Sequence, residues 1–145
     1  MSNLKETNSD DRIMSAIAHG AILLPMWGTI AAIIIWVTQK EKSEFVRQQA
    51  MQAIAWQVSQ IVIMFFGMAC YMCSFLTMIP FAETMETSSS GFPFFLIIPF
   101  GSMGFMMVSM LAFIVVGIVA AVRTLQGRPF TYPLIGRRIE NYLAQ

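Results

Sequence analysis

The segment EKSEFVRQQAMQAIAWQVSQ, Glu41–Gln60, decides how this chain folds. It begins as a short charged hinge and continues, through Phe45-Val46-Arg47, into a helix that carries a polar stripe. Beyond that stripe the chain becomes almost uniformly apolar. The hinge therefore separates one predicted membrane span before it from two more after it.

The composition is that of an integral membrane protein. Of the 145 residues, 57% are hydrophobic and 12% are charged, against about 25% charged in an ordinary soluble domain. A soluble chain of this length needs much more polar surface to cover its core. The formal net charge of +1 creates no field that would attract nucleic acid, so the expected partner is the lipid bilayer and no nucleic acid.

Three transmembrane helices are predicted, at about residues 13–37, 48–78 and 99–122, after a polar N-terminal tail at residues 1–11. The first stretch is free of charge and at helical rise covers about 37 Å, more than the roughly 30 Å of a hydrocarbon core. Pro25 predicts a kink within it. Two shorter helices folded back on each other are the alternative, but each would be too short to span, so one kinked helix is preferred.

The end of the chain differs in character from the spans. Gly127 and Pro129 predict the end of the last helix. Residues 134–145 place Ile135, Ile139 and Leu143 at i, i+4 and i+8 beside charged residues, which predicts a short amphipathic helix on the membrane surface. The fold class is therefore all-α integral membrane, with a membrane domain at residues 12–133.

The positive charges predict an orientation. With three spans, the first loop and the C-terminal segment lie on one side, and the N-terminal tail and the second loop on the other. The basic residues of the first side are Lys40, Lys42, Arg47, Arg123, Arg128, Arg137 and Arg138, and those of the second are Lys5 and Arg12. By the positive-inside rule, the N-terminus is expected outside and the C-terminus in the cytoplasm.

One face of the second predicted helix is polar or small. Its members, at helical spacing, are Gln48, Gln49, Gln52, Trp56, Ser59, Gln60, Gly67 and Ser74. Lipid tails cannot satisfy amide groups, so this face is expected to meet protein or water. Contact with another helix is the preferred interpretation, because small and polar residues form the usual contact surfaces of membrane bundles. The lining of a hydrophilic path is the alternative.

Few residues of the predicted spans offer chemistry. His19 is the only histidine and shares no span interior with a charged residue, so we interpret it as neutral and hydrogen-bonded. Cys70 and Cys73 have redox-motif spacing but lie within a predicted membrane helix, and one distant histidine does not complete a metal site. The 13 methionines are interpreted as core fillers scattered around their helices rather than as soft-metal ligands. No enzyme activity, cofactor or metal is expected.

Three segments resemble a known family. They are Ala16–Gly20; Ser43–Ala53, with Phe45, Val46, Arg47, Ala50, Gln52 and Ala53; and Gly127–Pro133, with Gly127, Tyr132 and Pro133. Together they resemble small bacterial membrane proteins of unknown function that are similar to the twenty-kilodalton membrane component of the chloroplast inner-envelope import translocon (Tic-twenty-like). The resemblance implies no catalytic residues and agrees with a cytoplasmic first loop. The plastid relative has four spans and works in a protein-conducting complex, whereas three spans are predicted here.

The function that these observations predict is non-enzymatic. We expect a polytopic inner-membrane protein that acts through helix–helix contacts, as an oligomer or as a small accessory subunit of a membrane complex. Its expected protein partners are other membrane subunits or further copies of itself. A component of a protein- or solute-translocation pathway is the alternative, favoured by the glutamine stripe and by the resemblance.

Overall fold

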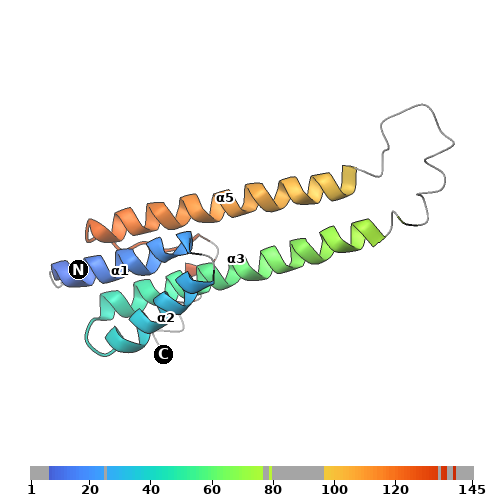
Figure 1. Ribbon diagram of the computed structural model, residues 1–145. Coiled ribbons are helices and arrows are strands. Elements are labelled where there is room, and N and C mark those ends of the chain that lie inside the picture. The colour runs from blue at the N-terminus through green and yellow to red at the C-terminus, as the bar shows by residue number, and fades with distance from the viewer. Residues whose placement is uncertain are drawn as a thin grey trace. The chain divides into compact units, whose positions relative to one another are not determined.

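The computed structural model describes residues 7–24, 26–76, 79, 97–133, 135, 136 and 139. The regular elements are α1 (Ser9–Gly20), the 3-10 helix η1 (Ala21–Leu23), α2 (Trp27–Gln39), α3 (Glu44–Leu76) and α5 (Ile97–Leu125), shown in Figure 1. The chain divides into two compact units, called here unit 1 (Met1–Ser59 and Phe113–Gln145) and unit 2 (Gln60–Ala112). Both α3 and α5 contribute to each unit, so each unit is described by itself.

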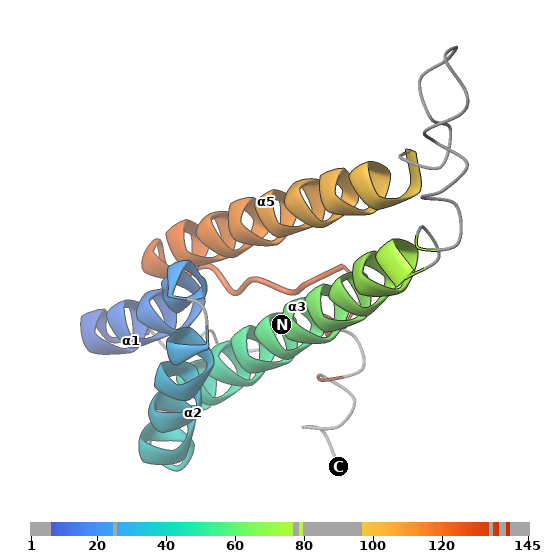
Figure 2. The same ribbon diagram turned by 45° about the vertical axis from the view of Figure 1, so that its right-hand side comes forward.

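The charge-free stretch that predicts the first span is not one helix. It forms α1, η1 and α2, and the chain reverses between Leu23 and Trp27, so that α2 folds back against α1 and η1 (Figure 2). Pro25 itself lies outside the described residues. The predicted single span at residues 13–37 is therefore wrong. Two helices in the described part of the chain, α3 and α5, are long and apolar enough to cross a membrane, rather than three.

The reversal depends on a glycine. A Cβ atom at Gly28 would overlap the carbonyl oxygen of Ala21, so no other residue fits without moving the backbone. The N–H of Gly28 donates to the oxygen of Leu24 at 2.7 Å, which closes the turn. Met26 has a φ of 63°, an uncommon value for a residue with a side chain. Close approach of the backbone is therefore built into the sequence at this position.

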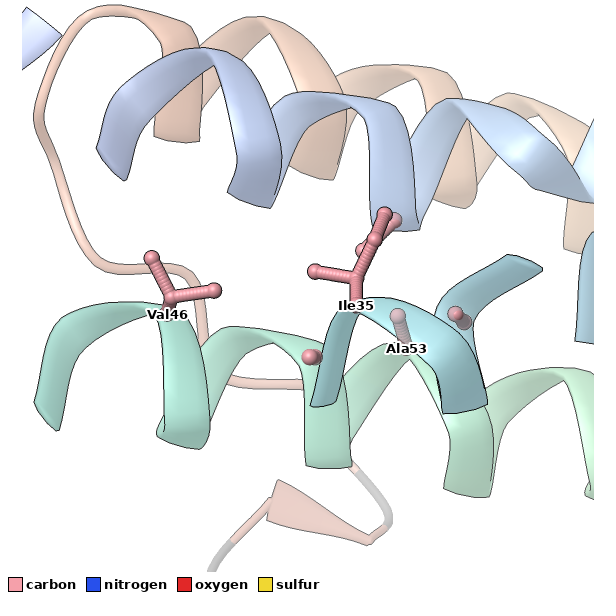
Figure 3. Packing of buried hydrophobic residues seen from close by; sticks show 6 residues of the cluster. Ile35, Val46 and Ala53 are labelled. Carbon is pink, nitrogen blue, oxygen red and sulfur yellow. The ribbon is translucent and has the colours of Figure 1, made fainter. Parts of the chain in front are cut away.

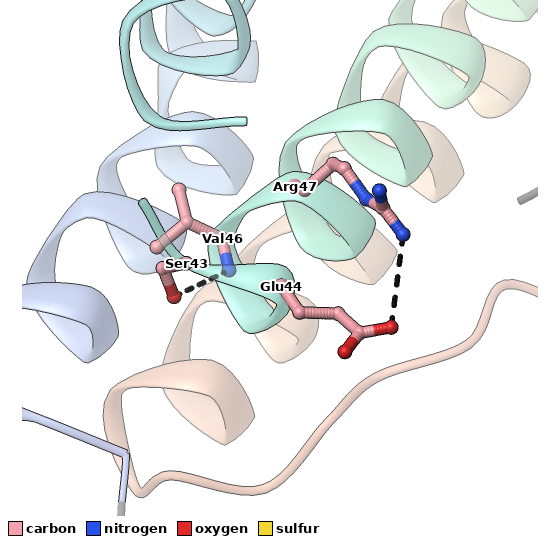
Figure 4. Close-up of polar contacts among 4 residues, drawn as sticks. All are labelled: Ser43, Glu44, Val46 and Arg47. Atoms are coloured by element: carbon pink, nitrogen blue, oxygen red, sulfur yellow. Dashed lines mark hydrogen bonds and ion pairs between the residues drawn. The ribbon is translucent and has the colours of Figure 1, made fainter. Parts of the chain in front are cut away.

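The start of α3 is capped by a serine that also contacts α1. The backbone N–H of Val46 donates to Ser43 Oγ at 3.3 Å (Figure 4), the geometry of a helix N-cap. Ser43 Oγ in turn donates to Asp11 Oδ2 at 2.9 Å. Arg47 pairs with Glu44 at 3.6 Å on the same turn. The first turn of α1 and the first turn of α3 therefore lie together at one end of unit 1.

The end of α5 lies at the same end of unit 1. Gly127, with a φ of 75°, donates its N–H to Thr124, and Arg128 donates to the oxygen of Arg123, the hydrogen-bond pattern of a Schellman cap. A Cβ atom at Gly127 would lie 2.8 Å from Nε of Arg12 in α1. The helix ends at Leu125, just before the Gly127 and Pro129 that predict its end.

Small residues form the core between the hairpin and α3. Val46, Ala50 and Ala53 of α3 are buried against the hairpin (Figure 3). Their partners are Ala18 of α1 and Ala32 and Ile35 of α2. Alanines allow helix backbones to approach closely, and such contacts are typical of membrane bundles. The Phe45–Ala53 segment that the sequence marks as a motif is thus the packing face of α3 in unit 1.

Unit 2 consists of the central lengths of α3 and α5. Its large apolar side chains are turned outward: Phe65 is 79% exposed, Phe66 70% and Val108 67%. Such a surface is suited to acyl chains rather than to water. The predicted amphipathic helix at residues 134–145 lies almost entirely outside the described residues, as do residues 1–6 and most of the segment between α3 and α5.

Candidate functional site

A buried polar cluster lies in unit 1, where three parts of the chain meet. They are α1, the first turns of α3, and the segment at residues 128–133, called here the C-terminal segment. Gly127 turns the chain sharply at the end of α5, which directs this segment back toward α1 and α3. The central residues of the cluster are His19, Gln49, Gln52 and Tyr132, and each is at most 2% exposed.

His19 is held by hydrogen bonds on both ring nitrogens. Its Nδ1 lies 2.9 Å from the hydroxyl of Tyr132, and its Nε2 lies 3.1 Å from Oε1 of Gln49. The same Oε1 atom accepts the backbone N–H of Phe130 at 3.3 Å, so it is the carbonyl oxygen of the amide. Nε2 must therefore donate, and Nδ1 accepts the hydroxyl proton of Tyr132. This network defines one neutral tautomer of His19.

Burial disfavours charge at both titratable members of the cluster. Desolvation lowers the pKa of His19 from 6.5 to about 4, and the hydrogen bond with Gln49 opposes this shift only in part. Desolvation also raises the pKa of Tyr132 above its ordinary value. At neutral pH the imidazole and the phenol are both uncharged. The hydrogen bond between them therefore joins two neutral groups.

The face of α3 next to His19 binds the backbone and the ring of the C-terminal segment. Gln52 Oε1 accepts the N–H of Tyr132 at 3.1 Å. Trp56 stacks on Tyr132 with 4.5 Å between ring centroids, and its Nε1 donates to the carbonyl oxygen of Phe113 at 3.2 Å. Arg123 lies over the ring of Phe130 at 5.8 Å. Aromatic and amide contacts together fix residues 130–132 against α3.

Gln57 is a member of this region that the sequence analysis missed. It is 3% exposed, and its Nε2 donates to the backbone oxygen of Ala18 at 3.1 Å, which ties α3 to α1. It lies off the face drawn through Gln49 and Gln52. The available signal was its residue type, because an amide within an apolar helix needs a protein or water partner wherever it points.

The predicted interaction face of α3 is divided among several environments. Gln49, Gln52 and Trp56 contact the chain's own C-terminal segment, whereas Gln48 is half-buried. Ser59 Oγ donates to the backbone oxygen of Ala55 in its own helix at 2.8 Å. The remaining members, Gln60, Gly67 and Ser74, belong to unit 2.

Methionines converge in unit 2. A cavity of about 280 Å³ is lined by Met64, Met68 and Tyr71 of α3 and by Met103, Met106, Met107 and Met110 of α5. Methionine is 13 of 145 residues but supplies six of these seven, so the interpretation of a scattered distribution is wrong for this group. A Cβ atom at Gly67 would lie 2.8 Å from Cγ of Met106, which shows how closely α5 approaches α3 there.

Other candidate ligands do not assemble. Cys70 and Cys73 are free thiols exposed on α3. Within the described ranges, no three His, Cys, Asp or Glu residues gather into a possible metal site.

A comparison with models of protein families identifies the family of the chain. The model of the MamF/MmsF family, the magnetosome magnetite crystal formation protein family, matches residues 10–139. The chain belongs to this family. The matched region contains the hairpin, both long helices and every residue of the polar cluster. No curated protein and no solved structure matches the chain.

Membership in the MamF/MmsF family corrects the earlier resemblance. The segments at residues 16–20, 43–53 and 127–133 lie within the matched region, so they are features of a MamF/MmsF protein, and the resemblance to the chloroplast import component is wrong. These segments meet in unit 1, where His19, Gln49 and Tyr132 bind one another. Family membership and two apolar helices identify a membrane protein of magnetosome formation.

Proposed function

We propose that this protein is a non-enzymatic component of the magnetosome membrane that takes part in magnetite crystal formation through contacts with other membrane proteins or further copies of itself. The observation that carries this proposal is the family match over residues 10–139, which covers both membrane-length helices. The printed description of the family supplies the process, and the outward apolar surface of unit 2 supplies a membrane setting.

The polar cluster supports a structural role within this function. His19 and Tyr132 are neutral, buried and bonded to each other, and the neighbouring glutamines bind backbone groups. The basic ring nitrogen of His19, Nδ1, is occupied by the hydroxyl of Tyr132, and the low pKa of His19 makes the imidazole a weak base at neutral pH. The cluster instead holds the C-terminal segment against α1 and α3, which gives unit 1 a fixed shape.

The geometry gives little support to a translocation pathway. Gln49 and Gln52 are 1% and 2% exposed, and both bind backbone N–H groups of the C-terminal segment. Amide side chains that line a water path would need an open face. Gln49 and Gln52 therefore give no support to a translocation pathway.

The proposal is tested by deleting the gene in the magnetite-forming host and imaging the crystals by electron microscopy. Crystals of altered size or shape are expected, with recovery when the wild-type gene is returned. Purified magnetosome membranes should contain the protein, and cross-linking in those membranes should capture it with itself or with other membrane proteins. Unchanged crystals after deletion would contradict a role in crystal formation.

A second comparison addresses the non-enzymatic part of the proposal. Two variants are returned to the deletion strain. One is His19→Phe, and the control is Val58→Ala at a position of α3 that is 44% exposed. Recovery of the crystals should follow the amount of folded protein in the membrane for both variants. A His19 variant that is present in normal amount but restores nothing would point to chemistry at His19.

A further inference from the structure

The geometry points to a re-entrant hairpin: α1, η1 and α2 enter one leaflet of the bilayer from the side of the N-terminus and return to that side without crossing. The partner of the hairpin is then the acyl chains of a single leaflet. This inference concerns the threading of the chain and does not rest on the proposed function.

The charges define an open end and a closed end of the hairpin. Charged residues stand in its first turn, at Asp10, Asp11 and Arg12, and directly after it, at Lys40, Glu41 and Lys42, with none in between. The open end is level with the ends of both long helices, because Asp11 bonds to Ser43 before α3 and Arg12 lies against Gly127 after α5. One plane of charged and capping groups therefore bounds this end of unit 1.

The depth of the hairpin matches one leaflet. The 12 residues of α1 and the 13 residues of α2 correspond to about 18 and 20 Å of helix at 1.5 Å per residue. A hydrocarbon core is about 30 Å thick, so neither helix crosses it, and each is long enough to pass the headgroups and enter the nearer half.

The closed end is the most exposed apolar part of the hairpin. Leu24 is 60% exposed, Met26 75% and Trp27 73%. Further large apolar side chains on the outside of the two helices are Ile13, Ile17, Leu23, Ile30, Ile33, Ile34 and Val37. So many exposed large apolar side chains on one hairpin are unfavourable in water, and the apolar tip is what insertion into acyl chains requires.

Two backbone N–H groups of the turn and the polar side chain of His19 find partners within the protein. The N–H of Leu24 donates to the oxygen of Ala21 at 2.9 Å, and the N–H of Gly28 donates to the oxygen of Leu24 at 2.7 Å. The polar side chain of His19 is turned inward to Gln49 and Tyr132 rather than outward to lipid. Polar backbone groups at membrane depth need partners within the protein, and these two hydrogen bonds supply them for the N–H groups of Leu24 and Gly28.

The hairpin changes the expected sidedness. With α3 and α5 as the crossings within the described residues, and a hairpin that returns to its own side, the N-terminus, the first loop and the C-terminal segment share one side and residues 77–96 are assigned to the other. All nine Lys and Arg residues then fall on one side, and residues 77–96 carry none. The positive-inside rule places this basic side in the cytoplasm, in contrast to the external N-terminus expected from three spans.

Sidedness is measured by cysteine labelling of the full chain in sealed vesicles of known orientation. The background is C70S/C73S, and single cysteines are introduced as Ser2→Cys, Ser88→Cys and Ala144→Cys. A membrane-impermeant maleimide should label positions 2 and 144 from the same side and position 88 from the opposite side. Labelling of positions 2 and 88 from one side would overturn the inference and restore three crossings.

Depth is measured by tryptophan quenching in vesicles that contain lipids brominated at different chain positions. A W36F/W56F variant keeps only Trp27 at the tip, and a W27F/W56F variant keeps only Trp36 near the open end as the matched control. Trp27 should be quenched most by bromines far along the acyl chain, and Trp36 by bromines near the headgroup. Strong quenching of Trp27 by aqueous acrylamide would overturn the inference. Trp56 stacks on Tyr132, so its replacement could unfold both variants. In that case the test of the inference is the labelling experiment, which leaves Trp56 intact.

Discussion

Nε2 of His19 donates to Oε1 of Gln49 across 3.1 Å, although the two residues are 30 positions apart and belong to different helices. The same oxygen also accepts the N–H of Phe130, 81 positions further along the chain. One amide oxygen thus joins α1, α3 and the C-terminal segment. We expect the stability of unit 1 to depend on this atom, because its loss would leave two N–H groups without their acceptor.

Replacement of Gln49 by leucine should destabilise unit 1. The change leaves the buried Nε2–H of His19 and the half-buried N–H of Phe130 without an acceptor, and a fully buried group of this kind costs about 1–3 kcal/mol. We expect the free energy of unfolding in mild detergent to fall by about 2–5 kcal/mol. Gln48→Leu, on the adjacent half-buried position, is the control and should change it by less than about 1 kcal/mol. Equal effects at the two positions would contradict the network.

The stability of the protein should depend on pH through His19. Its pKa in the folded state, about 4, is below its ordinary value of 6.5, so the unfolded chain binds a proton that the folded chain excludes. The contribution of neutral His19 to the free energy of unfolding is therefore complete above pH 6.5. It is lost as the pH falls toward 4, by a total of about 3 kcal/mol. Unfolding of the wild type and of His19→Asn is compared from pH 7.5 to pH 4. A difference that does not shrink as the pH falls would contradict the assignment.

Replacement of Gly28 by alanine should disrupt the hairpin, because the added methyl group overlaps the oxygen of Ala21. We expect loss of folded protein, or a lower free energy of unfolding by more than about 4 kcal/mol. Gly104→Ala is the matched control, since a Cβ atom there meets nothing within 4 Å, and in a helix interior it should be neutral or stabilising by up to about 1 kcal/mol. Thermal unfolding followed by circular dichroism measures both. A wild-type profile for Gly28→Ala would show that the turn differs from the one described.

Replacement of Gly127 by alanine tests the cap of α5. The variant residue must adopt a φ of 75°, and its Cβ atom would press on Arg12. The backbone conformation alone costs about 1–2 kcal/mol, so we expect a loss of at least that size. The same change in an Arg12→Ala background should lose less, because the side chain that it meets is absent. Identical losses in both backgrounds would leave the left-handed backbone as the whole cause.

Much of the helical framework was predictable from local sequence. The apolar runs predict α3 and α5, and Gly127 and Pro129 predict the end of α5, because each of these signals depends only on neighbouring residues. The hairpin was mispredicted because a charge-free run longer than a bilayer was assumed to cross it. The spacing Pro25-x-x-Gly28 was present as a signal for reversal, but the need for glycine appears only when the oxygen of Ala21 is in place.

The polar cluster was predictable only in part. The glutamines of α3 are visible as amides in an apolar helix, and a partner for them could be expected. Their actual partner, the segment around Tyr132, follows α5 and is not a membrane helix. The expectation that small and polar residues contact another helix therefore did not predict it. The contact of His19 with Tyr132 spans 113 positions, and no periodicity in the sequence reports on it. By contrast, the spacing of Met103, Met106, Met107 and Met110 was a readable helical face.

The hydrogen bonds of residues 130–132 have a consequence for biosynthesis. The acceptors on Gln49 and Gln52 and the imidazole of His19 are synthesised well before the groups that bind them, which lie 80 or more positions later in the chain. Until the ribosome has released Tyr132, α1 and α3 must hold open amide and imidazole groups in a lipid environment. Chains that end before residue 130 lack these partners, so ribosomes stalled there are expected to yield nascent chains that are degraded.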